Sequence, residues 1–277
     1  VEVEAHLASI RGVAGDQQAA LFGQGAWQPG SSKNTYGTGA FLLTNTGTTR
    51  PASTGGMLVT LACDAEGKAC YALEAAIFIA GAAVQWLRDG LGIIASSSET
   101  ESLARGLAGN DGVYFVPALT GLGAPHWESA ARGTIVGLTR GTGRAHLVRA
   151  ALEAMAYGTA DVLGAMQASS GTAMARLRVD GGASANDWLM QFQADVLGVP
   201  VERPDMVETT ALGAAGLAGI ASGVWRTADD FLAARRVTVF TPSGDRTAVG
   251  RAYREWHRAV RAALAWARDE AASASTA

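Results

Sequence analysis

One carboxylate and one amide, those of Asp16 and Gln17, stand where a short apolar run meets an alanine-rich segment. Residues 7–14 predict a strand, Gly15 a turn, and the residues from Asp16 onward a helix. A strand that ends at Gly15 would deliver Asp16 to the carboxyl edge of a sheet, where open α/β folds bind ligands. The alternative is that Asp16 only caps the helix that follows it.

A second candidate is the turn Gly37-Thr38-Gly39, which joins β-prone runs at 33–36 and 40–43 into a predicted hairpin. Glycine on both sides of Thr38 permits positive φ and leaves space beside the backbone, so N–H groups and one hydroxyl can face a phosphate. An ordinary hairpin turn without a ligand is the alternative.

Two further segments combine glycine with an amide. A helix is predicted over 75–89, in which Gly81 and Gln85 share a face. Glycine inside a helix costs about 1 kcal/mol relative to alanine, which indicates close approach of another group, with helix–helix packing as the alternative.

Residues 177–189 repeat the opening plan of strand, glycine turn and helix. Gly182 leaves bare backbone at the strand end, and Asn186 can turn toward the same place, where the amino terminus of the helix favours a polar or anionic group. The alternative is a capped turn, with Asp180 or Ser184 as the cap.

The elements that must hold these residues follow from periodicity and turn signals. We expect a hairpin at 58–61 and 70–73, strands at 113–118 and 133–138, a helix at 146–167 with a solvated polar face, an edge strand at 200–202, a slim helix at 211–222 that packs closely on a neighbour, and a helix at 248–269 capped by Thr247. The turn at 66–67 would set Cys63 opposite Cys70, and in a chain with so large a core both are expected to stay reduced.

Composition excludes several classes. The 22 basic and 25 acidic residues leave a net charge of −3, so we expect no nucleic-acid partner and no anionic membrane. No apolar run is long enough to span a bilayer and no leader opens the chain, which favours a cytoplasmic protein. The four histidines lack ligand spacing, so no protein metal site is expected. No Walker string and no G-x-G-x-x-G after a strand occurs, which disfavours a dehydrogenase.

Four segments together resemble the carboxyl-terminal domain of the FGGY carbohydrate kinase family, and within it the members that act on glycerol. They are residues 15–24 (GDQQAALFGQ), 33–39 (KNTYGTG), 121–127 (GLGAPHW) and 179–183 (VDGGA). Residues 133–153 also match the spacing of the family's second signature, and the likeness runs from about Ile10 to Trp225.

The resemblance implies an α/β fold of the actin-like ATPase, or ribonuclease H-like, type: a mixed β-sheet flanked by helices. It implies one domain over 1–277, with a core at about 8–225, a helical tail at about 226–277, and the family's amino-terminal domain absent. It also implies ATP and Mg²⁺ as cofactors, glycerol as the acceptor, and a homo-oligomer when the protein is complete.

By the same resemblance, Asp16 is similar to the family's catalytic base, Gln17 to a glycerol ligand and Phe41 to an apolar wall of the polyol pocket. The positions similar to nucleotide contacts are Thr38, Gly81, Gln85, Gly182 and Asn186. A carboxylate with a pKa of about 4 cannot ionise an alcohol beforehand, but it can orient the hydroxyl and take its proton late in a loose phosphoryl-transfer transition state.

Departures from the family pattern include Ala75, Gly216 and the loop 25–32, and no inhibitor loop is recognisable. With half of the cleft absent, we expect the chain alone to have little or no kinase activity. Two hypotheses stay open beside the glycerol kinase: a kinase for another polyol or ketose, and a non-catalytic nucleotide-binding fragment.

Overall fold

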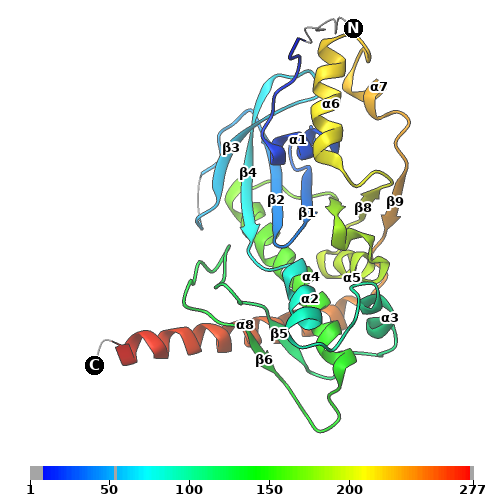
Figure 1. Ribbon diagram of the computed structural model, residues 1–277. Helices are drawn as coiled ribbons and strands as arrows, with labels where there is room; N and C mark the ends of the chain where they lie inside the picture. The colour runs from blue at the N-terminus through cyan, green and yellow to red at the C-terminus, as the bar shows by residue number, and fades with distance from the viewer. Residues whose placement is uncertain (1–8, 53–54, 275–277) are drawn as a thin grey trace, which may run out of the picture.

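The structure, a computed structural model, describes residues 9–52 and 55–274. Its main sheet has the strand order β3-β4-β2-β1-β7-β8-β9 (Figure 1). The strands are β1 (Ser32–Tyr36), β2 (Ala40–Gly47), β3 (Leu58–Cys63), β4 (Ala69–Ile77), β7 (Leu177–Gly181), β8 (Val201–Pro204) and β9 (Val237–Phe240). β1 is parallel to β7 and β7 to β8, whereas the other ladders are antiparallel.

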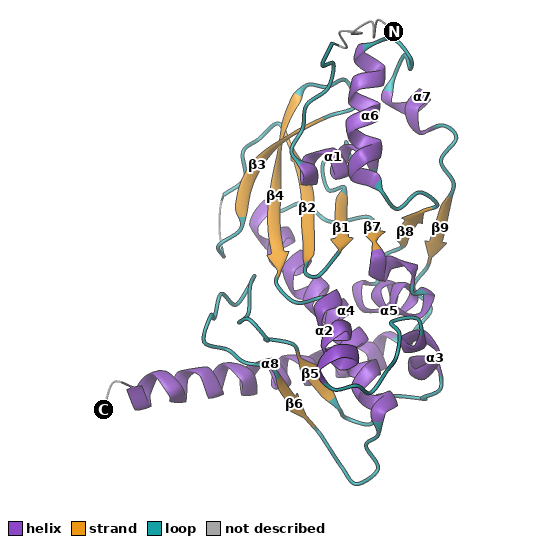
Figure 2. Ribbon diagram, in the orientation of Figure 1, coloured by secondary structure: helices purple, strands orange, loops and turns teal. Residues whose placement is uncertain are grey.

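Helices cover both faces of this sheet (Figure 2). α1 (Asp16–Gly23) and α6 (Thr209–Ala221) lie on one face, and α4 (Arg144–Ser170) and α5 (Asp187–Leu197) lie on the other. The predicted mixed sheet flanked by helices is therefore confirmed.

The alternation of β1 divides these two faces. Asn34 Nδ2 donates to Thr159 Oγ1 on α4 at 3.1 Å, and Tyr36 Oη donates to Gln193 Oε1 on α5 at 2.7 Å. Lys33, the residue before Asn34, points to the opposite face and donates to Gln17 on α1. Since side chains alternate along a strand, β1 presents one set of residues to each helix layer.

A second lobe lies beyond the end of the sheet where β1, β4 and β7 finish (Figure 1). Around the long helix α4 gather α2 (Gly81–Gln85) with a π-helical turn (Trp86–Gly90), α3 (Glu99–Arg105), the small sheet β5 (Tyr114–Val116) and β6 (Thr134–Val136), and α8 (Arg246–Ala274). The helix α7 (Ala228–Leu232) packs by α6 instead. The main apolar core is continuous from the sheet into this lobe.

The close packing predicted for the glycine-rich helix is confirmed, and its neighbour is α1. A Cβ atom added to Gly213 would lie 1.8 Å from the carbonyl oxygen of Ala19. The glycines of α6 thus let α1 approach backbone to backbone, and this contact holds α1 against α6.

The strand predicted at 7–14 is wrong for residues 9–14; residues 7 and 8 lie outside the described residues. This segment has no regular secondary structure, and Ile10 and Val13 are each 84% exposed. The apolar run has no strand partner among the described residues. Asp16 consequently stands at the start of α1 rather than at the end of a sheet strand.

The helix predicted at 75–89 is also largely wrong. Residues up to Ile77 continue β4, where Ala75 pairs with Leu42 of β2, and α2 covers only Gly81–Gln85 before the π-helical turn. Backbone pairing with a neighbouring strand overrides the helix propensity of alanine, which is a weak local preference.

Other details differ from the expectations. β8 is not an edge strand, because β9 pairs with it on the outside. The last helix begins at Arg246, and Asp245 rather than Thr247 caps it by accepting from the backbone N–H group of Thr247 at 2.8 Å. Cys63 pairs with Ala69, so it is diagonal to Cys70, and both cysteines are free, as expected.

The polar face predicted for the helix at 146–167 is only partly solvated, since Glu153 and Thr159 are buried. Among residues 9–52 and 55–274, no helix combines the length and the apolar content needed to cross a bilayer.

Candidate active site

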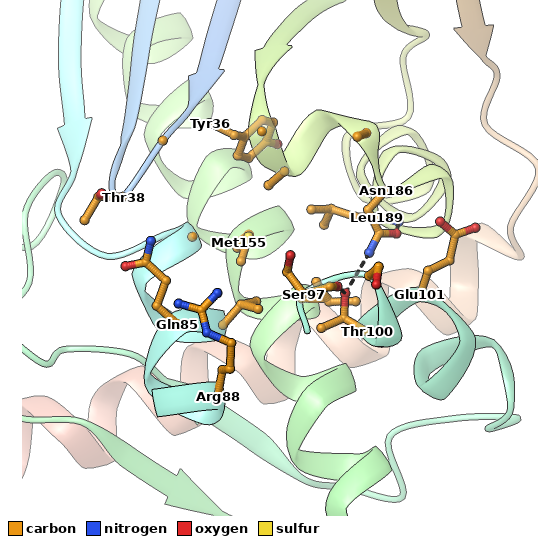
Figure 3. A pocket seen from close by; sticks show the side chains of 18 residues that line it. Tyr36, Thr38, Gln85, Arg88, Ser97, Thr100, Glu101, Met155, Asn186 and Leu189 are labelled. Atoms are coloured by element: carbon orange, nitrogen blue, oxygen red, sulfur yellow. Dashed lines mark hydrogen bonds between the residues drawn. The ribbon is translucent and has the colours of Figure 1, made fainter. Parts of the chain in front are cut away.

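A cavity of about 590 Å³ opens between the end of the sheet and the second lobe (Figure 3). Its walls come from the β1–β2 turn, α2, the segment 97–101, α4 and the residues between β7 and α5. All five predicted nucleotide positions line it: Thr38, Gly81, Gln85, Gly182 and Asn186. Segments as far apart in sequence as 38 and 186 thus meet around one space.

The β1–β2 turn is tied to the start of α2. The carbonyl oxygen of Thr38 accepts from the backbone N–H groups of Ala80 at 2.8 Å and Ala82 at 3.0 Å, and that of Gly37 accepts from Gly81 N at 3.0 Å. The turn cannot shift without α2, so the Thr38 side chain keeps its place at the cavity (Figure 3).

The glycine turn after β7 forms the opposite wall. Gly181 has φ of +80°, which favours glycine, and the chain then enters α5 with Asn186 as its N-cap. Asn186 Oδ1 accepts from Leu189 N at 2.9 Å, and Nδ2 donates to Thr100 Oγ1 at 3.2 Å. The cap is therefore Asn186, rather than Asp180 or Ser184, and its amide also joins α5 to α3.

Sequence reasoning missed several residues of this cavity. Tyr36, Arg88, Ser97, Ser98, Thr100 and Glu101 also line it. The hydroxyl-rich run that begins at Ser96 carries no recognisable motif, and it lies against the cavity because α3 packs on α4 and α5.

Asp16, Gln17 and Phe41 do not line the cavity. They lie on the α1 side of the sheet. Asp16 is exposed at the first turn of α1, where its Oδ1 accepts from Gln17 N at 2.8 Å and its Oδ2 accepts from Gln17 Nε2 at 3.4 Å. Phe41, on β2, is 40% exposed. The structure therefore forms two separate groups from the predicted residues, one on each side of the β1–β2 hairpin.

A buried polar layer underlies the Asp16 group. Lys33 is fully buried, and its Nζ donates to Gln17 Oε1 and to Thr35 Oγ1, the latter at 2.9 Å. Desolvation lowers the pKa of Lys33 to about 8, an effect that the charges of Asp180, Glu74 and Asp16 oppose.

Asp180, beside Lys33 in this layer, ties the sheet to two helices. Its Oδ2 accepts from Gln24 Nε2 at 3.0 Å and from the hydroxyl of Thr209 at the start of α6. The carboxylate in the β7 turn motif is thus a structural group on the α1 face and does not line the cavity.

The family model of the FGGY carbohydrate kinases, C-terminal domain, matches residues 32–222. The chain belongs to the FGGY family of carbohydrate kinases. Among its FGGY relatives, the glycerol kinase of Burkholderia pseudomallei is 58% identical over 94% of this chain, and that of Alkaliphilus metalliredigens is 56% identical over 94%. The chain spans about half of the length of these relatives, 52% of each.

Solved FGGY kinases share the fold. Plasmodium falciparum glycerol kinase with ADP matches with a TM-score of 0.84 and 38% identity, over 90% of this chain and 50% of that one. A xylulose kinase from Rhodospirillum rubrum matches with a TM-score of 0.79 and 25% identity, over 92% of this chain and 51% of that one. The FGGY fold of the chain is of the actin-like ATPase type, as expected.

Proposed function

We propose that this chain is the nucleotide-binding half of an ATP-dependent glycerol kinase, which converts glycerol to glycerol 3-phosphate. The observation that carries the proposal is the convergence of Thr38, Gly81, Gln85, Gly182 and Asn186 on one cavity. A relative of the same fold is solved with ADP, and relatives 54–58% identical over nearly the whole chain are glycerol kinases.

In this proposal the cavity holds the nucleotide. The backbone and hydroxyl of the β1–β2 turn at Thr38 face the phosphates, and the bare backbone at Gly182 admits a flat group beside α5. Asp16 orients the terminal hydroxyl of glycerol and accepts its proton as the γ-phosphoryl group is transferred. Gln17 donates to the acceptor, and Phe41 packs against its carbon chain.

Mg²⁺ is part of the proposal, and the donor set fits an ion carried by the nucleotide. Within the described residues, no three His, Cys, Asp or Glu side chains gather so as to hold a metal, but Asp16 offers an exposed carboxylate. Mg²⁺ is commonly bound by one or two carboxylates and substrate phosphates, and when bound it offsets phosphate charge. The phosphates of the nucleotide would hold the ion, and Asp16 keeps its role as the proton acceptor.

The acceptor and the assembly are also proposals. Gln17 and Phe41 favour glycerol, whereas the likeness to xylulose kinases keeps a ketose as the second candidate acceptor. We further propose that the complete protein works in the cytoplasm as a homo-oligomer, with the remaining half of the kinase closing over the cavity.

The test uses the full-length protein that contains this chain, assayed for ATP-dependent phosphorylation of glycerol and of a pentulose. Asp16→Asn should lower kcat by about a thousandfold, because it removes the proton acceptor while the cavity is unchanged. The KM for ATP should stay within about threefold, since Asp16 does not line the cavity.

Asp245→Asn, at a carboxylate that accepts a backbone N–H at the start of α8, is the matched control and should leave turnover unchanged. Equal kcat/KM for the pentulose would overturn the glycerol assignment, and full activity of the Asp16 variant would overturn the catalytic assignment.

A further inference from the structure

Lys33 is a buried cation in an unusual position. Its side chain is fully enclosed between β1 and α1, and no ion pair within 4.0 Å involves it among the described residues. Burial of an ammonium group is costly unless hydrogen bonds compensate for lost hydration. The compensation comes from the oxygens of Gln17 and Thr35, both neutral groups. A packing role alone would be filled at lower cost by an apolar side chain.

The contact with Gln17 decides how that amide is oriented. An ammonium group is only a donor, so it must face the amide oxygen Oε1. The amide nitrogen Nε2 is then turned outward, where it lies 3.4 Å from Asp16 Oδ2. One of the two hydrogens on Nε2 makes this contact, and the other can be donated to an oxygen of a bound ligand.

The same contact extends to Asp16. Gln17 holds both carboxylate oxygens, through its backbone N–H at 2.8 Å and its Nε2 at 3.4 Å. A Gln17 side chain that could rotate would release Oδ2 and could present its oxygen to the acceptor hydroxyl. Lys33 therefore determines which face of the amide, and which orientation of the carboxylate, meets the acceptor.

We propose that Lys33 is a positioning residue for the acceptor alcohol: through Oε1 it locks the Gln17 amide so that Nε2 donates to a hydroxyl oxygen of the acceptor and to Asp16. The inference rests on the proposed function, which supplies the acceptor. Burial lowers the pKa of Lys33 to about 8, so the ammonium group still carries its proton at neutral pH. It therefore has no lone pair with which to accept a hydrogen bond from Gln17 Nε2.

A counter-ion role for Lys33 is the competing explanation. Asp180 is the charge that most strongly favours the protonated Lys33, yet its Oδ2 is already bonded to Gln24 and Thr209. A lysine that only compensated the negative charge of Asp180 would stabilise the sheet, which supports both the nucleotide site and the acceptor site. Its loss would then weaken nucleotide and acceptor binding alike.

The experiment is a double-mutant cycle in the full-length protein with Lys33→Met, Gln17→Ala and both together. Lys33→Met should lower kcat/KM for glycerol by about 10- to 100-fold, with the KM for ATP within about twofold. The double variant should be no more than about threefold worse than Gln17→Ala alone, because Lys33 acts through Gln17. Lys68→Met, at the exposed β3–β4 turn, is the matched control and should resemble the wild type.

Multiplicative losses in the double variant, or an equal rise in both KM values, would overturn the positioning role. If Lys33→Met does not fold, Lys33→Gln replaces it, because the amide of the new glutamine can still donate to Gln17 without carrying a charge. Lys33→Gln should then retain more glycerol activity than Gln17→Ala.

The activity of the wild-type protein, rather than that of the variants, tests the proposed function. If the wild type phosphorylates another polyol or a ketose, the same cycle is run with that acceptor. If the wild type phosphorylates no alcohol, both proposals fall.

Discussion

Two glycines border the cavity under opposite constraints. A Cβ atom at Gly81 would lie 2.6 Å from the carbonyl oxygen of Gly37, so only a residue without a side chain lets α2 bond to the β1–β2 turn. A Cβ atom at Gly182 would meet nothing within 4 Å, and it would take up space at the cavity wall.

These constraints predict different effects of the same substitution. Gly81→Ala should lower both ADP affinity and the free energy of unfolding, the latter by about 1–3 kcal/mol, because the turn must move. Gly182→Ala should lower ADP affinity and leave the melting temperature unchanged. Calorimetric titration with ADP and thermal unfolding of the full-length protein measure both quantities.

Gly164→Ala is the control, since Gly164 lies on α4 away from the cavity with open space around it. Wild-type ADP affinity in Gly81→Ala, or a larger loss of stability in Gly182→Ala than in Gly81→Ala, would contradict this account.

At the residue scale, the cavity positions could be predicted because each carries a local signal, a glycine turn or an amide one helical turn from a glycine, and because the family resemblance chose the ligand-binding alternative for each. Lys33 and Thr100 could not, since each meets a residue of a separate element, Gln17 on α1 and Asn186 at the start of α5. Asn186 and Thr100, for example, are 86 positions apart. Lys33 belongs to the motif at 33–39, but no feature of the neighbouring sequence predicts that its ammonium group contacts Gln17.

At the element scale, α8 is attached to α4 through one buried carboxylate. Asp161 accepts from Tyr253 Oη at 2.5 Å and Trp256 Nε1 at 2.8 Å, and its Oδ1 lies 2.8 Å from His257 Nε2. The hydrogen bond with Asp161 raises the pKa of His257 above its ordinary value. His126, across the carboxylate, has its pKa lowered by burial.

The raised pKa of His257 predicts a pH-dependent attachment. The folded chain binds this proton more tightly than the unfolded chain, so the stabilisation is complete below an ordinary pKa of about 6.5 and is lost as the pH rises through the raised value. His257→Gln should therefore cost more stability at pH 6 than at pH 9, as urea unfolding of both forms would show. Equal losses at the two pH values would refute the argument. Because the charge of His257 also lowers the pKa of His126, the same comparison is made in a His126→Gln background.

Elements could be predicted where the sequence of the element itself defines it, without a contribution from a partner elsewhere in the chain. α1, the two hairpins, α4 and the long last helix follow from periodicity and turns. The strand predicted at 7–14 failed because an apolar run forms a strand only where a partner strand pairs with it. β9 was missed because Thr238 and Val239 are exposed on an outer strand, where no clear alternation marks it.

At the scale of the whole molecule, the chain spans about half the length of its FGGY relatives, and its surface is consistent with a covering partner. Ile10 and Val13, just before Asp16, are largely exposed, as are Leu58 and Leu61 on β3. Ile10 and Val13, within six positions of Asp16, are side chains that a covering domain could bury.

We therefore predict that residues 1–277 expressed alone bind ADP but produce no glycerol-dependent ADP from ATP above background. The nucleotide cavity is built from this chain, whereas the acceptor group around Asp16 stands open to solvent. A coupled assay for ADP production and calorimetric ADP binding measure the two properties. Turnover by the purified chain at the rate of the full-length protein would disprove the prediction.

The alternation of β1 has a consequence for how such a kinase changes its preferences. In the proposed kinase, the odd positions, Lys33 and Thr35, face the side of the acceptor alcohol, and the even positions, Asn34 and Tyr36, contact the helices α4 and α5 that border the nucleotide cavity. If the proposed function holds, side chains on one surface of this five-residue strand could change to fit a new acceptor without altering the surface that supports ATP binding. In that case, selection for a new acceptor and selection for ATP binding would act on different residues of the same strand.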